Sequence, residues 1–284
     1  MKSLNFKILF TLLALLNFHT VQAQIRALHT ASTGMAAQEM NVNTISNNIA
    51  NVNTVGFKKG RTEFDDLLYQ TITEPGARSG SDTNYNVGIQ IGSGAKVSAT
   101  RKEFSTGSPQ ITNNPFDLMI NGEGFFGIIL PNNEVRYTRD GAFQVDATGT
   151  LVTKQGHKVF PGITFPTNIS SINITENGNV DAYIRDQIEP SNVGVIPVFI
   201  LTNPVGLKSA GGNLYQVTAS SGAPTQNNPG TNGAGSIMQG TLESSNVSIM
   251  TEMTDLIRAQ RAYEMNAKVM GAADQMLQTV NNIR

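Results

Sequence analysis

The sequence contains no cysteine and no tryptophan, and only three histidines among its 284 residues. A chain without cysteine has no disulfide, no thiol nucleophile and no thiolate ligand for a metal. The histidines, at positions 19, 29 and 157, are too few for a histidine-rich metal site. These absences exclude thiol chemistry, thiolate metal sites and a histidine-rich metal site, and we expect neither a metal nor a cofactor.

The chain also has no large excess of positive or negative charge. Lysine and arginine total 20 and aspartate and glutamate 21, so the net charge is −1, and charged residues make up only 14% of the chain. Because a nucleic-acid-binding protein needs a basic surface, we expect no nucleic-acid partner. The 27 glycines favour a β protein with many turns over a helical enzyme.

The first 23 residues differ from the rest. Lys2 and Lys7 form a positively charged start, residues 8–18 are apolar, and residues 21–23 ("VQA") form a small-residue cleavage site. This order is typical of a secretory signal peptide, and the apolar run is shorter than the about 20 residues of a membrane span. The alternatives are a wrongly assigned start codon and an apolar tail that is not removed. We predict a leader over residues 1–23.

Apolar residues then recur with a spacing of seven, which predicts a helix over residues 24–56 with a coiled-coil seam. Gly56 should end this helix, because glycine adopts the left-handed conformation at low cost. The same spacing recurs at the other end of the chain, within residues 237–284. The predicted seam comprises Leu28, Met35, Val42, Ile45, Ile49, Val52, Ile249, Leu256, Tyr263, Met270 and Leu277.

The middle of the chain reads as strands and turns. Residues 57–115 predict an extended linker with strands, and residues 116–236 predict a β-rich outer domain; a return strand then precedes the last helix. The segment "SINITENGNVDAYI" is a hairpin candidate around Asn177-Gly178. The fold class is therefore α+β. The two terminal helices are expected to pack together as a coiled coil, because each apolar stripe needs a partner.

No motif indicates chemistry. The spacing of "NGEGFFG" (residues 121–127) fits a dinucleotide fingerprint, but a second strand follows instead of the helix that would bind the pyrophosphate. We interpret it as a strand-turn-strand. Glu63, Asp65 and Asp66 cluster on a short amphipathic element with no sign of a cleft. We therefore expect a protein that is not an enzyme and has no small-molecule substrate.

Three separated segments resemble one family, the bacterial flagellar rod and hook proteins. They are "NNIANVNTVGFKKGRTEFDDLLYQ", "DLMINGEGFF" with "YTRDGAFQVDATGTLVTKQGH", and "QGTLESSNVSIMTEMTDLIRAQRAYEMNAKVMGAADQML". The resemblance covers residues 25–284 and keeps the family's order. The segment "YQTITEPGARSGSDTNYNVGIQIGSGAKV" is similar to that of the family's distal-rod members. The family's N-terminal signature falls on Asn47, Asn48, Ala50, Asn51, Asn53, Thr54, Gly56 and Phe57.

This resemblance implies a structural subunit of the distal rod, located in the flagellar basal body in the periplasm. It implies self-assembly into a hollow helical shaft that transmits torque to the hook. The implied partners are further copies, the proximal rod proteins, the hook protein, the P- and L-ring proteins and the rod cap protein. One feature departs from the family, whose members leave the cell through the flagellar type III apparatus without a cleaved leader. The leader predicted here implies the general secretory route and a product that begins at Gln24.

The four asparagines in residues 47–57 raise a question, because asparagine costs roughly 0.5 kcal/mol relative to alanine inside a helix. We predict that the terminal segments stay largely unfolded in the free subunit. Neighbours in the polymer would then bury the apolar stripe and hydrogen-bond the uncharged amides. The alternative is that asparagine merely tolerates a solvated channel wall.

Other functions remain open from the sequence alone. The chain could be a proximal rod or hook subunit, or a secreted oligomeric β-rich binding protein such as an adhesin. A cell-wall hydrolase of the rod would need a carboxylate pair in a cleft, and no sequence feature identifies one.

Overall fold

The protein is described by a computed structural model that covers residues 2–76, 78, 86–166, 168–185 and 189–282, with the backbone alone for residues 2–25, 280 and 281. Two compact units are present, and each is assembled from separate stretches of the sequence. The helical unit comprises Met1–Ser46, Arg61–Arg101 and Met250–Arg284. The β unit comprises Asn47–Gly60 and Lys102–Ile249.

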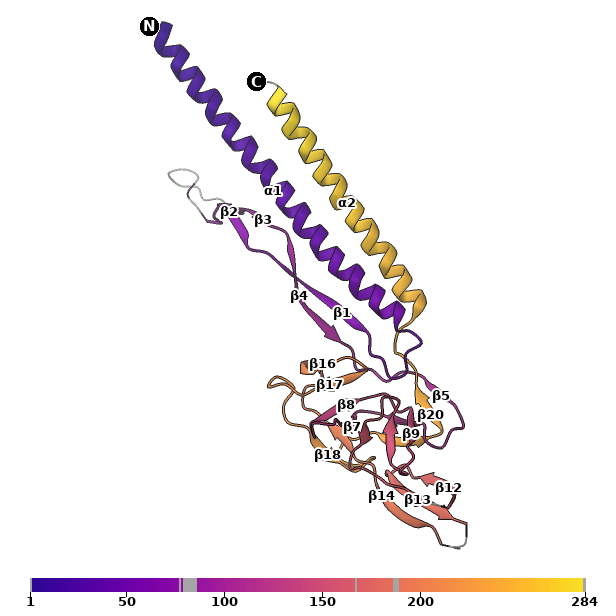
Figure 1. Ribbon diagram of the computed structural model, residues 1–284. Coiled ribbons are helices and arrows are strands. Elements are labelled where there is room, and N and C mark those ends of the chain that lie inside the picture. The colour runs from indigo at the N-terminus through magenta and orange to yellow at the C-terminus, as the bar shows by residue number, and fades with distance from the viewer. Residues whose placement is uncertain (1, 77, 79–85, 167, 186–188, 283–284) are drawn as a thin grey trace. The chain divides into compact units, whose positions relative to one another are not determined.

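Two long helices dominate the helical unit, α1 (Lys2–Ala50) and α2 (Ile249–Asn282). Both helices form in stretches without proline, the residue that most strongly breaks a helix, and Glu252 lies in the first turn of α2, where an acidic residue is favourable. Figure 1 shows α1 and α2 running antiparallel, and a Cβ atom at Gly34 of α1 would lie 2.8 Å from the Asn266 side chain of α2. Buried alanines at positions 31, 37, 259 and 273 are compatible with this close approach.

Four strands complete the helical unit as two antiparallel pairs. They are β1 (Gly60–Asp66) with β4 (Ala95–Lys102), and β2 (Tyr69–Thr73) with β3 (Ile89–Gly92). Thr62 on β1 donates a hydrogen bond to Thr44 of α1 at 3.1 Å. No helix in the part of the chain with described side chains is long and apolar enough to cross a membrane.

The β unit is built around an antiparallel sheet in the order β16-β17-β8-β7-β11-β10-β9. Its strands are β7 (Phe126–Ile129), β8 (Val135–Thr138), β9 (Phe143–Val145), β10 (Leu151–Thr153), β11 (Lys158–Val159), β16 (Lys208–Ser209) and β17 (Leu214–Gln216). A second sheet joins β12 (Ile169–Ile174), β13 (Asn179–Ile184) and β14 (Ser191–Val195). The predicted hairpin is confirmed, because Ile172 lies opposite Ala182 and Ile174 opposite Val180.

Three further strand pairs connect distant parts of the β unit. In each pair, a strand from the C-terminal third of the chain lies beside a strand that comes earlier in the sequence. The pairs are β5 (Pro109–Ile111) with β20 (Thr241–Glu243), β6 (Leu118–Asn121) with β19 (Ser236–Gln239), and β15 (Val198–Ile200) with β18 (Thr225–Asn227). A short 3-10 helix spans Pro204–Gly206. The strands between two terminal helices confirm the α+β class.

The glycine-rich segment "NGEGFFG" forms a strand-turn-strand, as predicted. It connects β6 to β7, and Gly122 and Gly124 have positive φ angles of 122° and 128°. A Cβ atom at Gly122 would lie 2.9 Å from the Cα atom of Gly235. These glycines therefore permit close backbone packing, and the element that follows them is a strand rather than the helix that a pyrophosphate requires.

The N-terminal helix ends earlier than predicted. It stops at Ala50 instead of Gly56, and the residues between form hydrogen-bonded turns. The predicted leader lies within the backbone of α1, and its side chains are outside the described part of the chain.

The core of the β unit should respond strongly to truncation. Phe126 is fully buried and packs edge-to-face against Phe143, with ring centroids 5.2 Å apart. We expect Phe126→Ala to lower the free energy of unfolding by about 3–5 kcal/mol, measured by urea denaturation. Val145→Ala, at a residue exposed to 36%, is the control and should cost under about 1 kcal/mol. Equal losses in the two variants would contradict this assignment of the core.

Candidate assembly site: the terminal helices and the buried junction

The signature asparagines lie at the end of α1 and in the turn that follows. The Asn48 side chain is 2% exposed, and its amide forms two hydrogen bonds with the backbone of Gly60, each 2.8 Å long. Amide side chains offer both a donor and an acceptor, so one asparagine satisfies both backbone groups of Gly60. We expected these amides to bind neighbouring subunits. For Asn48 this is wrong, because its amide is buried and binds its own chain.

The turn after α1 is closed by side chains of the same signature. Asn51 donates from Nδ2 to the Asn47 carbonyl oxygen at 2.9 Å and accepts from Thr54 Oγ1 at 3.2 Å. Gly56 has a φ angle of +67°, and a Cβ atom there would lie 2.6 Å from the carbonyl carbon of Arg139. Glycine is therefore required at position 56 for its conformation and for space, although it does not end the helix.

A cluster of buried charges follows the turn, and we call it, with its surrounding backbone, the buried junction (residues 55–59, 102–108, Arg139 and 243–246). Lys58 and Glu243 are both 0% exposed, and Lys58 Nζ lies 2.6 Å from Glu243 Oε1. Arg139, which is 2% exposed, places Nη1 3.5 Å from Glu243 Oε2. Burial lowers the pKa of Lys58 and that of Arg139, while the charge of Glu243 opposes both shifts.

Backbone groups also form hydrogen bonds with these charged side chains. Lys58 Nζ donates to the Ser105 carbonyl oxygen at 2.6 Å, and Gly107 N–H donates to Glu243 Oε1 at 2.8 Å. The Arg139 guanidinium donates to the carbonyl oxygens of Ile120 and Gly122, at 3.2 and 2.6 Å. One carboxylate thus serves two buried cations from distant parts of the sequence.

Phe57 lies beside this cluster and is also buried. Lys102 Nζ lies 4.3 Å from the centroid of the Phe57 ring and donates a 2.8 Å hydrogen bond to the carbonyl oxygen of Lys58. Burial lowers the pKa of Lys102. The other signature residues, Asn47, Ala50 and Asn53, have exposed side chains in the single chain.

The predicted seam residues are distributed unevenly in the single chain. Ile45 is buried, whereas Ile249 and Tyr263 are exposed. The remaining eight are half-buried: Leu28, Met35, Val42, Ile49, Val52, Leu256, Met270 and Leu277. On α2 the most buried line with a spacing of seven is Glu252, Ala259, Asn266 and Ala273. Small and polar residues therefore form part of the inward face of α2. A heptad pattern of large apolar residues does not include them.

The outward face of α2 carries apolar side chains as well. At 100° per residue, Met250, Met253 and Ile257 lie opposite Ala259. They are exposed to 79%, 45% and 48%. Met265, Val269 and Met276 continue the exposed apolar surface along the flank of α2. We refer to these six residues as the outer stripe.

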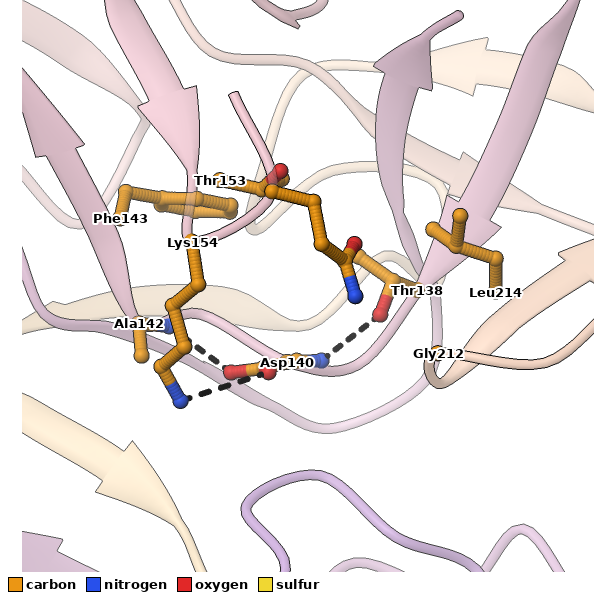
Figure 2. A pocket seen from close by; sticks show the side chains of 9 residues that line it. Thr138, Asp140, Ala142, Phe143, Thr153, Lys154, Gly212 and Leu214 are labelled. Atoms are coloured by element: carbon orange, nitrogen blue, oxygen red, sulfur yellow. Dashed lines mark hydrogen bonds and ion pairs between the residues drawn. The ribbon is translucent and has the colours of Figure 1, made fainter. Parts of the chain in front are cut away.

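Two hollows are present among the described residues. The hollow in Figure 2 has a volume of about 40 Å³, room for one or two water molecules. In it Asp140 accepts a hydrogen bond from Ala142 N–H at 3.0 Å and faces Lys154 Nζ at 3.8 Å; burial raises the pKa of this carboxyl group. A second cavity of about 200 Å³ lies in the helical unit, lined by Arg26, His29, Thr30, Gln70, Ile91, Gly92 and Ser93, none of them a carboxylate. Within the described residues, no cluster could hold a metal ion.

Three family profiles match separate parts of the chain. "Flagella basal body rod protein" matches residues 28–58, and "Flagellar hook protein FlgE/F/G D1 domain" matches residues 119–182. "Flagellar basal body rod FlgEFG protein C-terminal" matches residues 238–283. The predicted leader lies outside these three segments.

Curated relatives match nearly the whole chain. The flagellar basal-body rod protein FlgG of Caulobacter vibrioides is 48% identical over 92% of this chain and 100% of its own length. The FlgG protein of Borreliella burgdorferi is 47% identical over 92% and 99%. The chain belongs to the FlgG family of flagellar basal-body rod proteins. This confirms the resemblance read from the sequence.

More distant matches include another FlgG protein and a hook protein. The FlgG protein of Bacillus subtilis is 37% identical over 92% of this chain and 99% of its own length. A crystal structure of a Helicobacter pylori flagellar hook protein, FlgE2, is 14% identical and covers 66% of this chain and 43% of its own. Its TM-score of 0.23 is too low to support an argument about the fold.

Sequence reasoning missed the buried junction. Lys58, Arg139 and Glu243 follow no period and match no catalytic spacing. The sequence offered one weak signal. Charged residues make up only 14% of the chain, so a charged residue within or next to a predicted strand or the signature was a candidate for burial. Their convergence depends on contacts across 104 and 185 positions of the chain.

The two neighbouring asparagines provide a matched test. We expect Asn48→Ala to lower the free energy of unfolding by about 2 kcal/mol, because both backbone groups of Gly60 lose their partner in a buried site. Asn47→Ala removes an exposed side chain and should change stability by less than about 0.5 kcal/mol. Chemical denaturation of both full-length variants measures the difference. Equal effects would show that the Asn48 amide does not stabilise the turn.

Proposed function

We propose that this chain is a structural subunit of the distal rod of the bacterial flagellum. Copies polymerise into the hollow shaft that carries torque through the periplasm to the hook. The observation that carries this proposal is family membership over almost the full length of named basal-body rod proteins. The outer stripe on α2 supports it independently, since it requires cover that the single chain does not provide.

The outer stripe fits a second copy of this chain. Contiguous exposed apolar residues mark protein interfaces, and methionine adapts well to irregular packing surfaces. The stripe follows the length of a helix, so a helix of matching length from a neighbouring subunit is its natural cover. Terminal helices of adjacent subunits would then form the wall of the tube.

The predicted seam belongs to the same proposal. Within one subunit the terminal helices pack as a coiled coil through the half-buried residues Leu28, Met35, Val42, Ile49, Val52, Leu256, Met270 and Leu277 and the buried Ile45. Ile249 and Tyr263 are exposed in the single chain and are assigned to contacts between subunits. Knobs-into-holes packing at this spacing would give the tube wall its stiffness.

The proposed partners are those of a distal rod. They are the proximal rod proteins on one side, the hook protein on the other, the P- and L-ring proteins around the shaft, and the rod cap protein during growth. No enzymatic activity is part of the proposal. The charged groups of the buried junction form hydrogen bonds and ion pairs with the backbone and with one another. The hollow in Figure 2, at about 40 Å³, is far smaller than the about 300 Å³ of a typical ligand pocket.

Two adjacent residues of α2 separate folding from assembly. Leu256 faces inward and is half-buried, whereas Ile257 belongs to the outer stripe. We expect Ile257→Asp to leave the stability of the free subunit within about 0.5 kcal/mol but to abolish rods, since it would place an unpaired charge in the interface. The sequence predicted largely unfolded terminal segments in the free subunit, whereas the structure has both terminal helices folded in the single chain. With the helices folded, we expect Leu256→Asp to reduce both subunit stability and assembly.

Thermal melts followed by circular dichroism measure the first effect, and electron microscopy of isolated basal bodies with swimming in soft agar measures the second. Ile257→Leu keeps the apolar surface and serves as the control that should assemble. Normal rods built from Ile257→Asp would rule out the outer stripe as a subunit contact.

A further inference from the structure

The buried junction joins one residue from each of the three segments that define the family. Lys58 is the last residue of the N-terminal segment, Arg139 lies in the D1 segment, and Glu243 lies in the C-terminal segment. Two cations therefore share one carboxylate, and Glu243 is the member that arrives from the C-terminal part of the chain.

The same C-terminal stretch supplies further hydrogen bonds to the junction. The Glu243 carbonyl oxygen accepts from Gly56 N–H at 2.8 Å, and Asn246 Oδ1 accepts from Lys59 N–H at 2.8 Å. Ser244 N–H donates to the Ser108 carbonyl oxygen at 2.9 Å. Residues 243–246 thus bind both the signature and the loop at 102–108.

Glu243 is the carboxylate that Lys58 and Arg139 share, and the charge of Glu123 also acts on Arg139. Lys58 Nζ has one other described partner, the Ser105 carbonyl oxygen. Arg139 already leaves its Nε without a hydrogen-bond partner in the described structure. An ion buried without its counter-ion is strongly disfavoured, so Lys58 cannot enter this site at low cost before the carboxylate is present.

We propose that Glu243 acts as a latch: the signature docks into the β unit only after residues 243–246 are in place. Before that, the signature and Arg139 remain hydrated and the junction stays open. Lys58 and Glu243 are 185 positions apart, and a chain made from its N-terminus presents Glu243 late. The last step of folding is then set by a residue that lies six positions before α2 begins.

Strand pairing also makes folding of the β unit depend on the C-terminal segment. Strands β19 and β20, which immediately precede Glu243 or contain it, pair with β6 and β5. Ile237 of β19 belongs to the main core of the β unit. A subunit whose C-terminal segment is still unavailable therefore lacks a core residue as well as the carboxylate, and its junction stays open.

The test uses full-length protein and hydrogen exchange followed by mass spectrometry. In Glu243→Gln we expect amides in residues 55–59 and 102–108 to exchange about a hundredfold faster than in the unmodified chain, because the junction opens while the core stays closed. Amides of β7 and β10 should change by less than about twofold. Glu63→Gln is the control. It neutralises a partly exposed carboxylate of the helical unit that pairs with Arg101 at 3.1 Å, and it should change neither region.

Two results would overturn the latch. Equal acceleration in the junction and the core would make Glu243 a general stabiliser of the β unit, and an unchanged junction would remove its role. If Glu243→Gln does not fold, native-state exchange of the unmodified chain in low denaturant decides the matter. The amides of Gly56, Lys59 and Gly107 should then open together and before the core. Opening of these amides only with the core would refute the proposal. Both measurements use free subunits, so they are independent of the role in the rod.

Discussion

The burial of Lys58 against Glu243 is the constraint on which the joining of the N-terminal signature, the loop at 102–108 and the C-terminal strand depends. An ion pair with no exposed surface is tolerated only when every charged group keeps its hydrogen bonds, and here backbone groups of the loop at 102–108 supply several of them. Arg139 shares the same carboxylate, so three distant segments are held at one point. Because each of these segments belongs to a different family-defining region, the junction links the parts of the chain that the rod family has in common.

The helices divide their surfaces between two tasks. Small side chains on the inward face, such as Ala31, Ala259 and Ala273, allow α1 and α2 to approach closely within the helical unit. Methionines and β-branched residues on the outward face of α2 remain exposed. A helix that is apolar on two sides is poorly suited to a lone subunit but well suited to a wall in which every helix has neighbours on several sides.

Polar side chains in this protein mainly organise the backbone. Asn48 completes the hydrogen bonds of Gly60, Asn51 closes the turn after α1, and Asn246 binds the backbone on both sides of the junction. Amides suit this role because one side chain both donates and accepts hydrogen bonds and carries no charge. Apart from Arg139 Nε, the buried side chains named at the junction thus have partners within the chain.

The sequence by itself determined the two proline-free helices, the strands between them and the family, because periodicity and contiguous motifs are local properties of the chain. Tertiary structure decided the rest. Asn48 reads as an awkward helix residue until Gly60 is placed beside it, and the helix ends at Ala50 because the following turn is stabilised by the signature and by Glu243. Large apolar residues predicted Ile249 and Tyr263 as seam positions, whereas alanines and Asn266 lie on the most buried line of α2. The Lys58–Glu243 pair could not be read from local pattern, since its members are 185 residues apart and only folding brings their charges together.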